Sequence, residues 1–491
     1  SDAKALSDYA IAMGADARAA TVDATAIGHN ATATGNAATA LGANANASNQ
    51  STIAISAGPN TTTASGVGSI AIGTNVTSNG TGNIATGAGA NATGNGAVAT
   101  GSGSVANGNN AVAFGTNTNA TGAKAIAIGS DSKAQANNAT AIGNTAIVTA
   151  EAAIAMGYNT TAASTDAIVI GSGSNVSTNS ANATVVGKNS SVQTNSTNAT
   201  VLGSNSVAEA NSVNATVVGQ FSAAGKDSVN ATVVGSRSYV RPKTNDGTAL
   251  GHYAGVDNST TNGTSVGART WVGENVNNGT ALGVYNLVGN NTQNTIAVGV
   301  ANNVADGTKN NTVIGHGNTI ASNGTTVLGN NLNIAAGLDE AVVLGNHSTT
   351  TGSHTIANVT EATVGNLTYS GFKGTVAGAG SFVSVGAAGN ERKLINVAAG
   401  NISDTSTEAI NGSQLYAVTS QLDKTNETAK AAASSASSAV SLASAAASTA
   451  TSAAEVVNSN LSKIESAASA AASAAMAAST SASAAGSSAT A

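Results

Sequence analysis

The stretch Tyr9-Ala10-Ile11-Ala12-Met13-Gly14 contains the unit that decides the fold of this chain. The pattern returns as Thr25-Ala26-Ile27-Gly28, Ile70-Ala71-Ile72-Gly73, Ile126-Ala127-Ile128-Gly129 and Thr184-Val185-Val186-Gly187. Apolar residues alternate with small ones within each unit, which is the period of a β-strand. Self-similarity at a fixed spacing indicates a repeat architecture. The sequence therefore predicts a β-solenoid.

The glycine that closes each unit sets the length of the coil. The spacing is 14 residues over Gly14, Gly28 and Gly42, and again over Gly73, Gly87, Gly101, Gly115, Gly129, Gly143, Gly157 and Gly171, with Ser56 in the glycine position once, before an insertion. It becomes 16 residues over Gly187, Gly203, Gly219, Gly235, Gly251, Gly267, Gly283, Gly299 and Gly315, and the last two glycines are Gly329 and Gly345. A weaker half-repeat, such as Ala33-Thr34-Gly35, lies midway in the shorter units. We therefore expect two short strands in each coil.

Alternation assigns the side chains of each unit to two faces. The residue before the glycine is usually large and the residue two positions earlier is usually β-branched, as in Met13 and Ile11. We expect this pair to point inside the coil. The residue between them, such as Ala12 or Val185, then points outward. Since a solvent-facing strand would be polar there, we expect a second buried surface, such as a contact between chains.

The composition excludes several classes of protein. Aromatic residues make up 2% and charged residues 8% of the chain, and the net charge of −6 is diffuse, so we expect no nucleic acid partner. The absence of cysteine excludes disulfides and thiol chemistry, and it fits an extracellular protein but is also compatible with the cytoplasm. The sequence contains no recognisable signal peptide and no long apolar run. If the protein acts at a surface, we expect its export signal and its membrane anchor to lie outside this sequence.

Catalytic patterns are weak. Gly263-Thr264-Ser265-Val266-Gly267 matches the nucleophile-elbow pattern G-x-S-x-G, but Ser265 occupies the small position of a repeat and no strand-to-helix turn is predicted there. The histidines are scattered, and no Asp-rich calcium repeat occurs. We therefore expect a non-enzymatic protein with no catalytic residue, no cofactor and no metal.

The C-terminal part has a helical period. Apolar residues recur every seventh position at Leu415, Leu422, Ala429, Ala436, Ala443, Ala450, Val457, Ile464 and Ala471, and the complementary series from Val418 includes Asn460. Such a heptad pattern predicts a coiled coil. The alternative is a disordered Ala/Ser-rich linker. Beyond Ser479 we expect fraying, and the order of 479–491 stays open.

These segments in this order resemble the passenger of a trimeric autotransporter adhesin, a class of surface protein of Gram-negative bacteria. The repeats of residues 1–350 resemble that family's head, a trimeric left-handed parallel β-roll, and 351–388 form an irregular β segment. Residues 389–414 are similar to its neck, where the corresponding residues are Asn390, Arg392, Asn396, Asn411, Gln414 and Leu415. Residues 415–491 resemble the coiled-coil stalk.

The resemblance carries several expectations. It implies a homotrimer with the small face of each strand along the three-fold axis, and a possible stalk layer in which three copies of Asn460 enclose an anion. It also implies secretion by the type V route, anchoring in the outer membrane through a segment outside this sequence, and a role in virulence. Its partners would be a host receptor or a matrix protein such as collagen, fibronectin or laminin.

One group of residues suggests a binding site. Phe221, Arg237, Tyr253, Arg269 and Tyr285 each lie two positions after a repeat glycine, and Tyr239 and Trp271 lie two positions further on. Equivalent positions on adjacent coils are about 4.8 Å apart, so aromatic and guanidinium groups would alternate within cation–π reach. These residues form either a structural ladder or a ligand-binding patch, because Tyr, Trp and Arg are typical anchors.

We expect a homotrimeric adhesin that gains avidity from three identical faces. A phage-type trimeric spike that binds or cleaves polysaccharide is the alternative, but cleavage would require a groove with paired carboxylates, and acids are sparse. An ice-binding solenoid is a third class; its outward Thr-x-Thr array is not seen, because the recurrent Thr184, Thr200 and Thr216 share the face of the large aliphatic residue.

Overall fold

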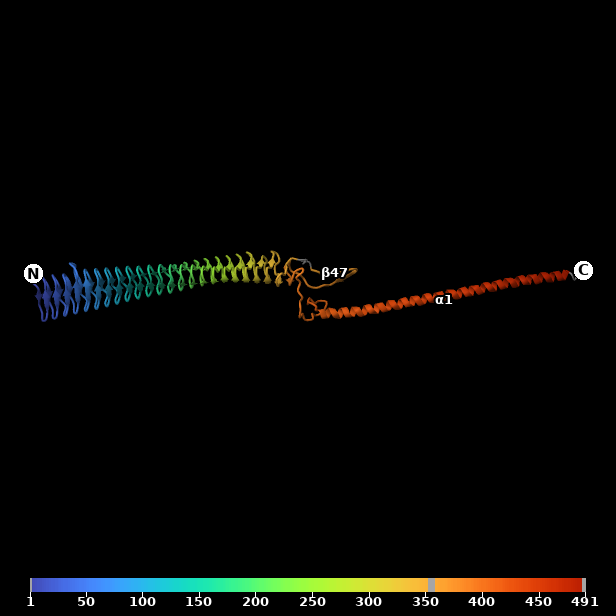
Figure 1. The fold of residues 1–491 in the computed structure, drawn as a ribbon, viewed down its shortest axis with the longest axis horizontal. Coiled ribbons are helices and arrows are strands. Elements are labelled where there is room, and N and C mark those ends of the chain that lie inside the picture. The colour runs from blue at the N-terminus through green and yellow to red at the C-terminus, as the bar shows by residue number, and fades with distance from the viewer. Residues whose placement is uncertain (1, 352–357, 488–491) are drawn as a thin grey trace. The chain divides into compact units, whose positions relative to one another are not determined.

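The computed structural model describes residues 2–351 and 358–487. The chain divides into two compact units, Ser1–Asn358 with Thr375–Arg392, and Val359–Gly374 with Lys393–Ala491. The first unit is a parallel β-solenoid whose coils stack in sequence order, and the second contains a β-hairpin and one long helix (Figure 1). The expected β-solenoid followed by a C-terminal helix is confirmed.

Two parallel sheets form the solenoid, and each coil adds one strand to each sheet, as expected. The first, sheet A, contains the strands β1 (Lys4–Ala5), β3 (Arg18–Ala19), β5 (Thr32–Ala33), β7 (Ala45–Ala47), β9 (Thr62–Ala64), β11 (Thr77–Ser78), β13 (Asn91–Ala92), β15 (Val105–Ala106), β17 (Asn119–Ala120), β19 (Lys133–Ala134), β21 (Ile147–Val148), β23 (Thr161–Ala162), β25 (Asn175–Val176), β27 (Ser191–Val192), β29 (Val207–Ala208), β31 (Ala223–Ala224), β33 (Tyr239–Val240), β35 (Gly255–Val256), β37 (Trp271–Val272), β39 (Leu287–Val288), β41 (Asn303–Val304), β43 (Thr319–Ile320) and β45 (Asn333–Ile334).

The second, sheet B, contains the repeat units themselves. Its strands are β2 (Ile11–Met13), β4 (Thr25–Ile27), β6 (Thr39–Leu41), β8 (Ile53–Ser56), β10 (Ile70–Gly73), β12 (Ile84–Thr86), β14 (Val98–Thr100), β16 (Val112–Phe114), β18 (Ile126–Ile128), β20 (Thr140–Ile142), β22 (Ile154–Met156), β24 (Ile168–Ile170), β26 (Thr184–Val186), β28 (Thr200–Leu202), β30 (Thr216–Val218), β32 (Thr232–Val234), β34 (Thr248–Leu250), β36 (Thr264–Ala268), β38 (Asn277–Val284), β40 (Gln293–Val300), β42 (Thr312–His316), β44 (Thr326–Asn330), β46 (Val342–Leu344) and β49 (Val383–Ser384). Register is exact from coil to coil, so that Ile126, Ala127 and Ile128 pair with Thr140, Ala141 and Ile142.

The core of the coil consists of small residues. In most coils the small residue in the middle of the sheet B strand, such as Ala127, and the last residue of the sheet A strand, such as Ala134, are fully buried. The prediction that the large residues point inside was therefore wrong. The two sheets lie so close together that mainly Ala, Val, Ser and Thr fit between them, and the flanking Ile126 and Ile128 of β18 point outward.

The same correction applies to the expected lining of the three-fold axis. The small face belongs to the interior of one chain, and the outward face of sheet B carries the large apolar residues instead. Thr184, Thr200 and Thr216 also lie on this outward face, where they alternate with Val186, Leu202 and Val218 rather than with a second threonine.

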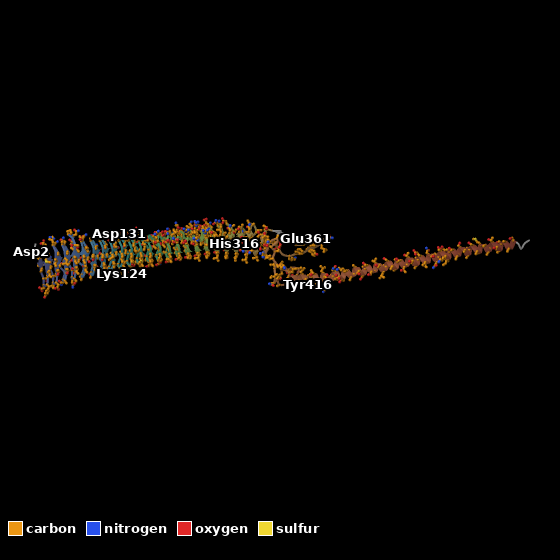
Figure 2. All side chains as sticks on the ribbon, viewed as in Figure 1. Asp2, Lys124, Asp131, His316, Glu361 and Tyr416 are labelled. Atoms are coloured by element: carbon orange, nitrogen blue, oxygen red, sulfur yellow. The ribbon has the colours of Figure 1, made fainter. Side chains whose placement is uncertain are left out.

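Tight turns join the strands. The anchoring glycines adopt positive φ, such as 116° at Gly129, and an added Cβ there would lie 2.6 Å from the backbone of Gly143 in the next coil. Charged turn residues such as Lys124 and Asp131 point away from the coil (Figure 2).

The longer coils contain buried polar ladders. Ser206 Oγ donates to the Gly219 carbonyl at 2.7 Å and accepts the Ser222 N–H at 3.2 Å. Asparagine takes this position at Asn286, Asn302 and Asn318, and Asn302 Nδ2 donates to the Gly315 carbonyl at 2.8 Å. A buried polar group is costly without a partner. The ladders give these buried side chains and turn carbonyls their partners, so the longer turns can fold over the core.

Ser265 belongs to the same interior. It is fully buried, and its Oγ donates to the Thr270 carbonyl at 2.8 Å. It is therefore an internal residue of a coil and is not placed at the exposed turn that a nucleophile elbow requires.

The second unit follows the array. Strands β47 (Glu361–Val364) and β48 (Leu367–Ser370) form an antiparallel hairpin. The helix α1 (Gly412–Ser487) is 76 residues long, and none of its described residues is buried. In the described part of the chain, no helix combines the length and the apolar character needed to span a membrane. Of the segment 351–388, residues 352–357 lie outside the described residues, as do 488–491 of the expected fraying end.

Candidate functional site

A ladder of five side chains lies along the turn that follows sheet B. We call it the turn ladder, and it consists of Phe221, Arg237, Tyr253, Arg269 and Tyr285. The Arg237 guanidinium lies 5.8 Å from the Phe221 ring centre and 5.4 Å from that of Tyr253. The Arg269 guanidinium lies 5.8 Å from the Tyr253 ring centre and 5.3 Å from that of Tyr285. The expected alternation of aromatic and guanidinium groups is therefore present.

Hydrogen bonds fix the guanidinium groups of the turn ladder. Arg237 Nη1 donates to the Tyr253 hydroxyl at 2.5 Å, and Arg269 Nη1 donates to the Tyr285 hydroxyl. Phe221 and Tyr285 remain 50% and 54% exposed, so the ladder is a surface feature.

The backbone of the turn ladder is strained. All five residues adopt φ between 54° and 56°, a region that costs about 1–2 kcal/mol for a residue with a bulky side chain. In many other coils the same turn position is held by asparagine, aspartate or glycine, as in Asn189, Asp131 and Gly173, which tolerate this conformation, but Thr145, Ala301 and His347 also adopt it. The positive φ is therefore a feature of this turn throughout the array, and the turn ladder differs in the bulk of the side chains that occupy it.

Tyr239 and Trp271 form a separate group on the outer face of sheet A. Their ring centres are 5.3 Å apart in an edge-to-face arrangement. The Arg241 guanidinium lies 5.0 Å from the Tyr239 ring centre and 5.8 Å from that of Trp271, and its Nε pairs with Asp257 Oδ1 at 3.1 Å. We call Tyr239, Arg241, Asp257 and Trp271 the sheet A patch.

Gly255 makes the sheet A patch possible. It is the register partner of both Tyr239 and Trp271, so it lies in the coil between them. An added Cβ at Gly255 would lie 2.9 Å from two carbon atoms of the Tyr239 ring. The missing side chain therefore leaves the space in which the two rings meet.

Burial raises the pKa of Tyr239 above its ordinary value of 10.0, and the neighbouring Arg241 partly opposes this by favouring the phenolate. The phenol therefore stays neutral at physiological pH.

The seven candidate binding residues thus divide between two surfaces rather than forming one edge. Sequence reasoning missed Arg241, Asp257 and Gly255. Arg241 and Asp257 are 16 residues apart, which is one coil, so their opposite charges in the repeat register were the signal that could have found them. Among the described residues, no three His, Asp or Glu side chains are grouped so that they could hold a metal ion.

Arg392, the second of the residues expected in a neck, attaches its segment to the last coils of the solenoid. Its guanidinium donates to the Asn346 carbonyl at 2.6 Å, to Ser348 Oγ at 3.1 Å and to the Val385 carbonyl. It also lies over Gly345, where an added Cβ would be 2.8 Å from the guanidinium carbon. The other residues expected at this end of the neck take turn conformations, with the Asn390 N–H bonded to the Ala387 carbonyl at 2.8 Å and Asn396 at a φ of 62°.

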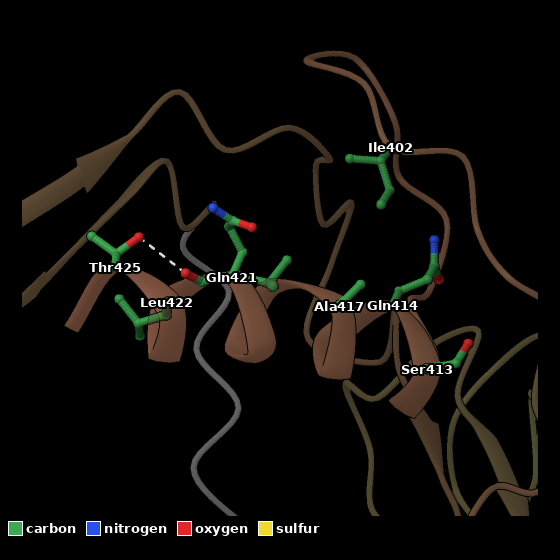
Figure 3. A pocket seen from close by; sticks show the side chains of 8 residues that line it. Ile402, Ser413, Gln414, Ala417, Gln421, Leu422 and Thr425 are labelled. Atoms are coloured by element: carbon green, nitrogen blue, oxygen red, sulfur yellow. Dashed lines mark hydrogen bonds between the residues drawn. The ribbon is translucent and has the colours of Figure 1, made fainter. Parts of the chain in front are cut away.

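Asn411 and Gln414, also expected in a neck, join the preceding segment to α1. Asn411 Oδ1 accepts the Gln414 N–H at 3.3 Å, which caps the helix, and Asn411 Nδ2 donates to the Val397 carbonyl at 3.0 Å. The Gln414 amide exchanges hydrogen bonds with the backbone of Gly400, at 2.6 and 3.0 Å. A groove beside Ile402 is lined by Gln414, Ala417 and Leu422 of the same helix (Figure 3). Leu415 is 54% exposed in the first turn.

The outward face of sheet B is a continuous apolar surface. Each strand contributes one or two large side chains. In β24, for example, Ile168 and Ile170 are 36% and 39% exposed. Outward residues of sheet A are mostly polar, such as Thr77, Asn91, Asn119 and Lys133. The two faces of the coil therefore differ in chemistry along the array.

These features define a repeat protein with a parallel β-solenoid and one long C-terminal helix. The family model described as "YadA head domain repeat (2 copies)" matches residues 5–31, 19–45, 33–55, 60–75, 92–118, 120–146 and 149–174. The chain consists of YadA head repeats over these ranges and fits the passenger of a trimeric autotransporter adhesin, as its sequence suggests. No curated protein matches the chain.

Proposed function

We propose that this chain forms a homotrimeric bacterial surface adhesin whose head attaches to a host receptor or to extracellular matrix. The observation that supports the trimer is the apolar outward face of sheet B. A monomer would leave side chains such as Ile128, Ile170 and Leu202 at 36–39% exposure along the whole array, and soluble monomers rarely expose apolar patches larger than a few hundred Å². Packing these faces around a three-fold axis removes them from water, at about 25 cal/mol per Å² buried.

The helix supports the same assembly. Leu415, Leu422, Val457 and Ile464 recur at heptad spacing on α1 and are 54–66% exposed in the single chain. An isolated helix of this composition gains little from packing, whereas a coiled coil buries this seam. In the trimer, three copies of Asn460 would form a polar layer in the seam, and we propose that it holds an anion.

Attachment is assigned to the turn ladder and the sheet A patch. Three copies of each surface on one rigid head gain avidity from weak individual contacts. The non-enzymatic role, the position at the outer membrane and the export by the type V route belong to the same proposal.

Trp271→Ala tests the attachment role. Adhesion to host cells and to arrayed matrix proteins and the melting temperature are measured on the same protein. We expect adhesion to fall by a larger factor than stability accounts for, because Trp271 is only partly buried on the outer face of sheet A and its contact with Tyr239 adds about 0.5–1.5 kcal/mol to the burial that is lost. Adhesion that falls only as folding does would make the sheet A patch structural.

A further inference from the structure

The part of the solenoid edge that holds the turn ladder is free of acidic residues, whereas Asp16 and Asp131 occupy the same turn position in earlier coils. From Lys188 to His347, the two residues after each repeat glycine include Arg237 and Arg269 but neither Asp nor Glu. The carboxylates of the same coils lie in the segment that connects each sheet A strand to the next sheet B strand, as in Asp227, Asp246 and Glu274. In a chain with a net charge of −6, this edge is therefore locally cationic.

The two guanidinium groups of the turn ladder are also free of ion pairs. Within the described part of the chain, neither Arg237 nor Arg269 contacts a carboxylate, whereas Arg241 pairs with Asp257. Each ladder guanidinium uses Nη1 to hold a tyrosine hydroxyl and packs between two rings. The remaining N–H groups stay available, and the planar fork is held in place before a ligand arrives, which favours oxyanion binding.

The spacing of these groups selects a type of ligand. Arg237 and Arg269 are two coils apart, which corresponds to about 9.6 Å along the array. An extended peptide repeats its same-face side chains about every 6.8 Å, so its acidic groups do not match this spacing. A polysaccharide built from disaccharides repeats its anionic groups over two sugar rings, which is a longer and more regular interval.

We infer that the turn ladder binds a linear anionic polysaccharide, with Arg237 and Arg269 each contacting a sulfate or carboxylate group of the repeating unit. Tyr253 keeps the two guanidinium groups in register from between them, and Phe221 and Tyr285 close the two ends. The inference rests on the proposed adhesive function and names the ligand class for one of its two surfaces. It also gives a reason for bulky side chains at strained turn positions, because smaller residues in place of the aromatic rings would not hold the guanidinium groups.

The test uses the full chain and defined probes. Heparin, chondroitin sulfate and hyaluronan distinguish sulfate from carboxylate, and polyglutamate represents an acidic peptide. We expect at least one polysaccharide to bind, with an affinity that falls as salt rises, and the double substitution Arg237→Gln with Arg269→Gln to weaken it at least tenfold. Arg18→Gln, which removes an exposed arginine from the outer face of sheet A, should leave binding within twofold.

Two further variants separate geometry from charge and folding. Arg237→Lys with Arg269→Lys keeps both charges but loses the planar fork, and we expect an intermediate loss of affinity. Tyr253→Phe keeps the ring between the guanidinium groups but removes the hydroxyl that holds Arg237. Its melting curve should match that of the wild type if the ladder is folded as described.

Several results would overturn the inference. They are the failure of all three polysaccharides to bind, equal binding by the double glutamine variant, and binding of polyglutamate as tight as that of the polysaccharides. Adhesion to host cells and matrix is measured on the same proteins. Adhesion without polysaccharide binding overturns the ligand class and leaves the adhesin, whereas polysaccharide binding without adhesion to any cell or matrix overturns the proposed function.

Discussion

Tyr239 and Trp271 are two coils apart, yet their rings meet edge to face at 5.3 Å because Gly255 of the intervening coil has no side chain. The contact couples three successive strands of sheet A on their outer face. Trp271 is the only tryptophan of the chain, so tryptophan fluorescence reports on the sheet A patch.

Gly255→Ala should separate the two rings. The new Cβ would lie 2.9 Å from the Tyr239 ring, which must turn away. We expect a loss of about 0.5–1.5 kcal/mol in the free energy of unfolding, since that is the usual worth of an aromatic pair. The measurement is chemical denaturation followed by Trp271 emission. The control is Ala223→Ser, which changes a residue on the outer face of the same sheet. Gly273→Ala would not serve, because its added Cβ would lie 2.9 Å from backbone atoms. An unchanged emission maximum in Gly255→Ala would contradict the role given to Gly255.

The raised pKa of Tyr239 predicts a loss of stability at alkaline pH. The folded protein holds the phenolic proton more tightly than the unfolded chain, whose tyrosines titrate near 10.0. The contribution is therefore complete below pH 10 and is lost as the pH rises through the folded pKa. Comparing melting temperatures of the wild type and Tyr239→Phe across this range isolates it, and we expect a steeper decline for the wild type. Parallel declines would contradict the assignment.

Arg392→Gln should loosen the end of the solenoid. The change removes three hydrogen bonds, two to Asn346 and Ser348 just after β46 and one to Val385 just after β49. Hydrogen exchange should become faster around β46 and β49 and stay unchanged around β18. Protection that remains at β46 would show that Arg392 is not what holds these segments together.

A glutamate introduced on the inner face of β18 should affect folding, whereas one introduced on its outer face should affect assembly. Ala127→Glu places a carboxylate inside the coil, where it has no partner, so we expect a failure to fold. Ile128→Glu lies on the outward face of sheet B and should leave the strands intact while blocking assembly. Lys133→Glu, on the exposed face of sheet A, is the control and should affect neither. Circular dichroism measures folding and light scattering measures assembly; an assembled Ile128→Glu variant would contradict the apolar interface.

The sequence was sufficient to predict the repeat, its strands and the helix, because the spacing of glycines such as Gly129 and Gly143 is a direct record of the coil. It did not predict which face is the interior. Alternation separates Ala127 from Ile126 and Ile128, but it does not reveal how close two sheets lie, and the close spacing is what places alanine inside. Composition alone favours the larger residues for a core, which led to the reversed assignment.

The candidate site shows the same limit. The periodic residues Arg237 and Tyr253 could be predicted to meet, since they occupy one turn position in adjacent coils. The division into the turn ladder and the sheet A patch could not, because a difference of two residues moves a side chain from a turn to a strand. Gly255 carried no signal in the sequence, since its function is to leave space.

Sedimentation equilibrium of the full chain is the most direct test of the proposed trimer. We predict a single species at three times the chain mass of 46.6 kDa, because both the outward face of sheet B and the seam of α1 are left uncovered in one chain. A species at 46.6 kDa that remains folded and monomeric over the accessible range of concentration would contradict it.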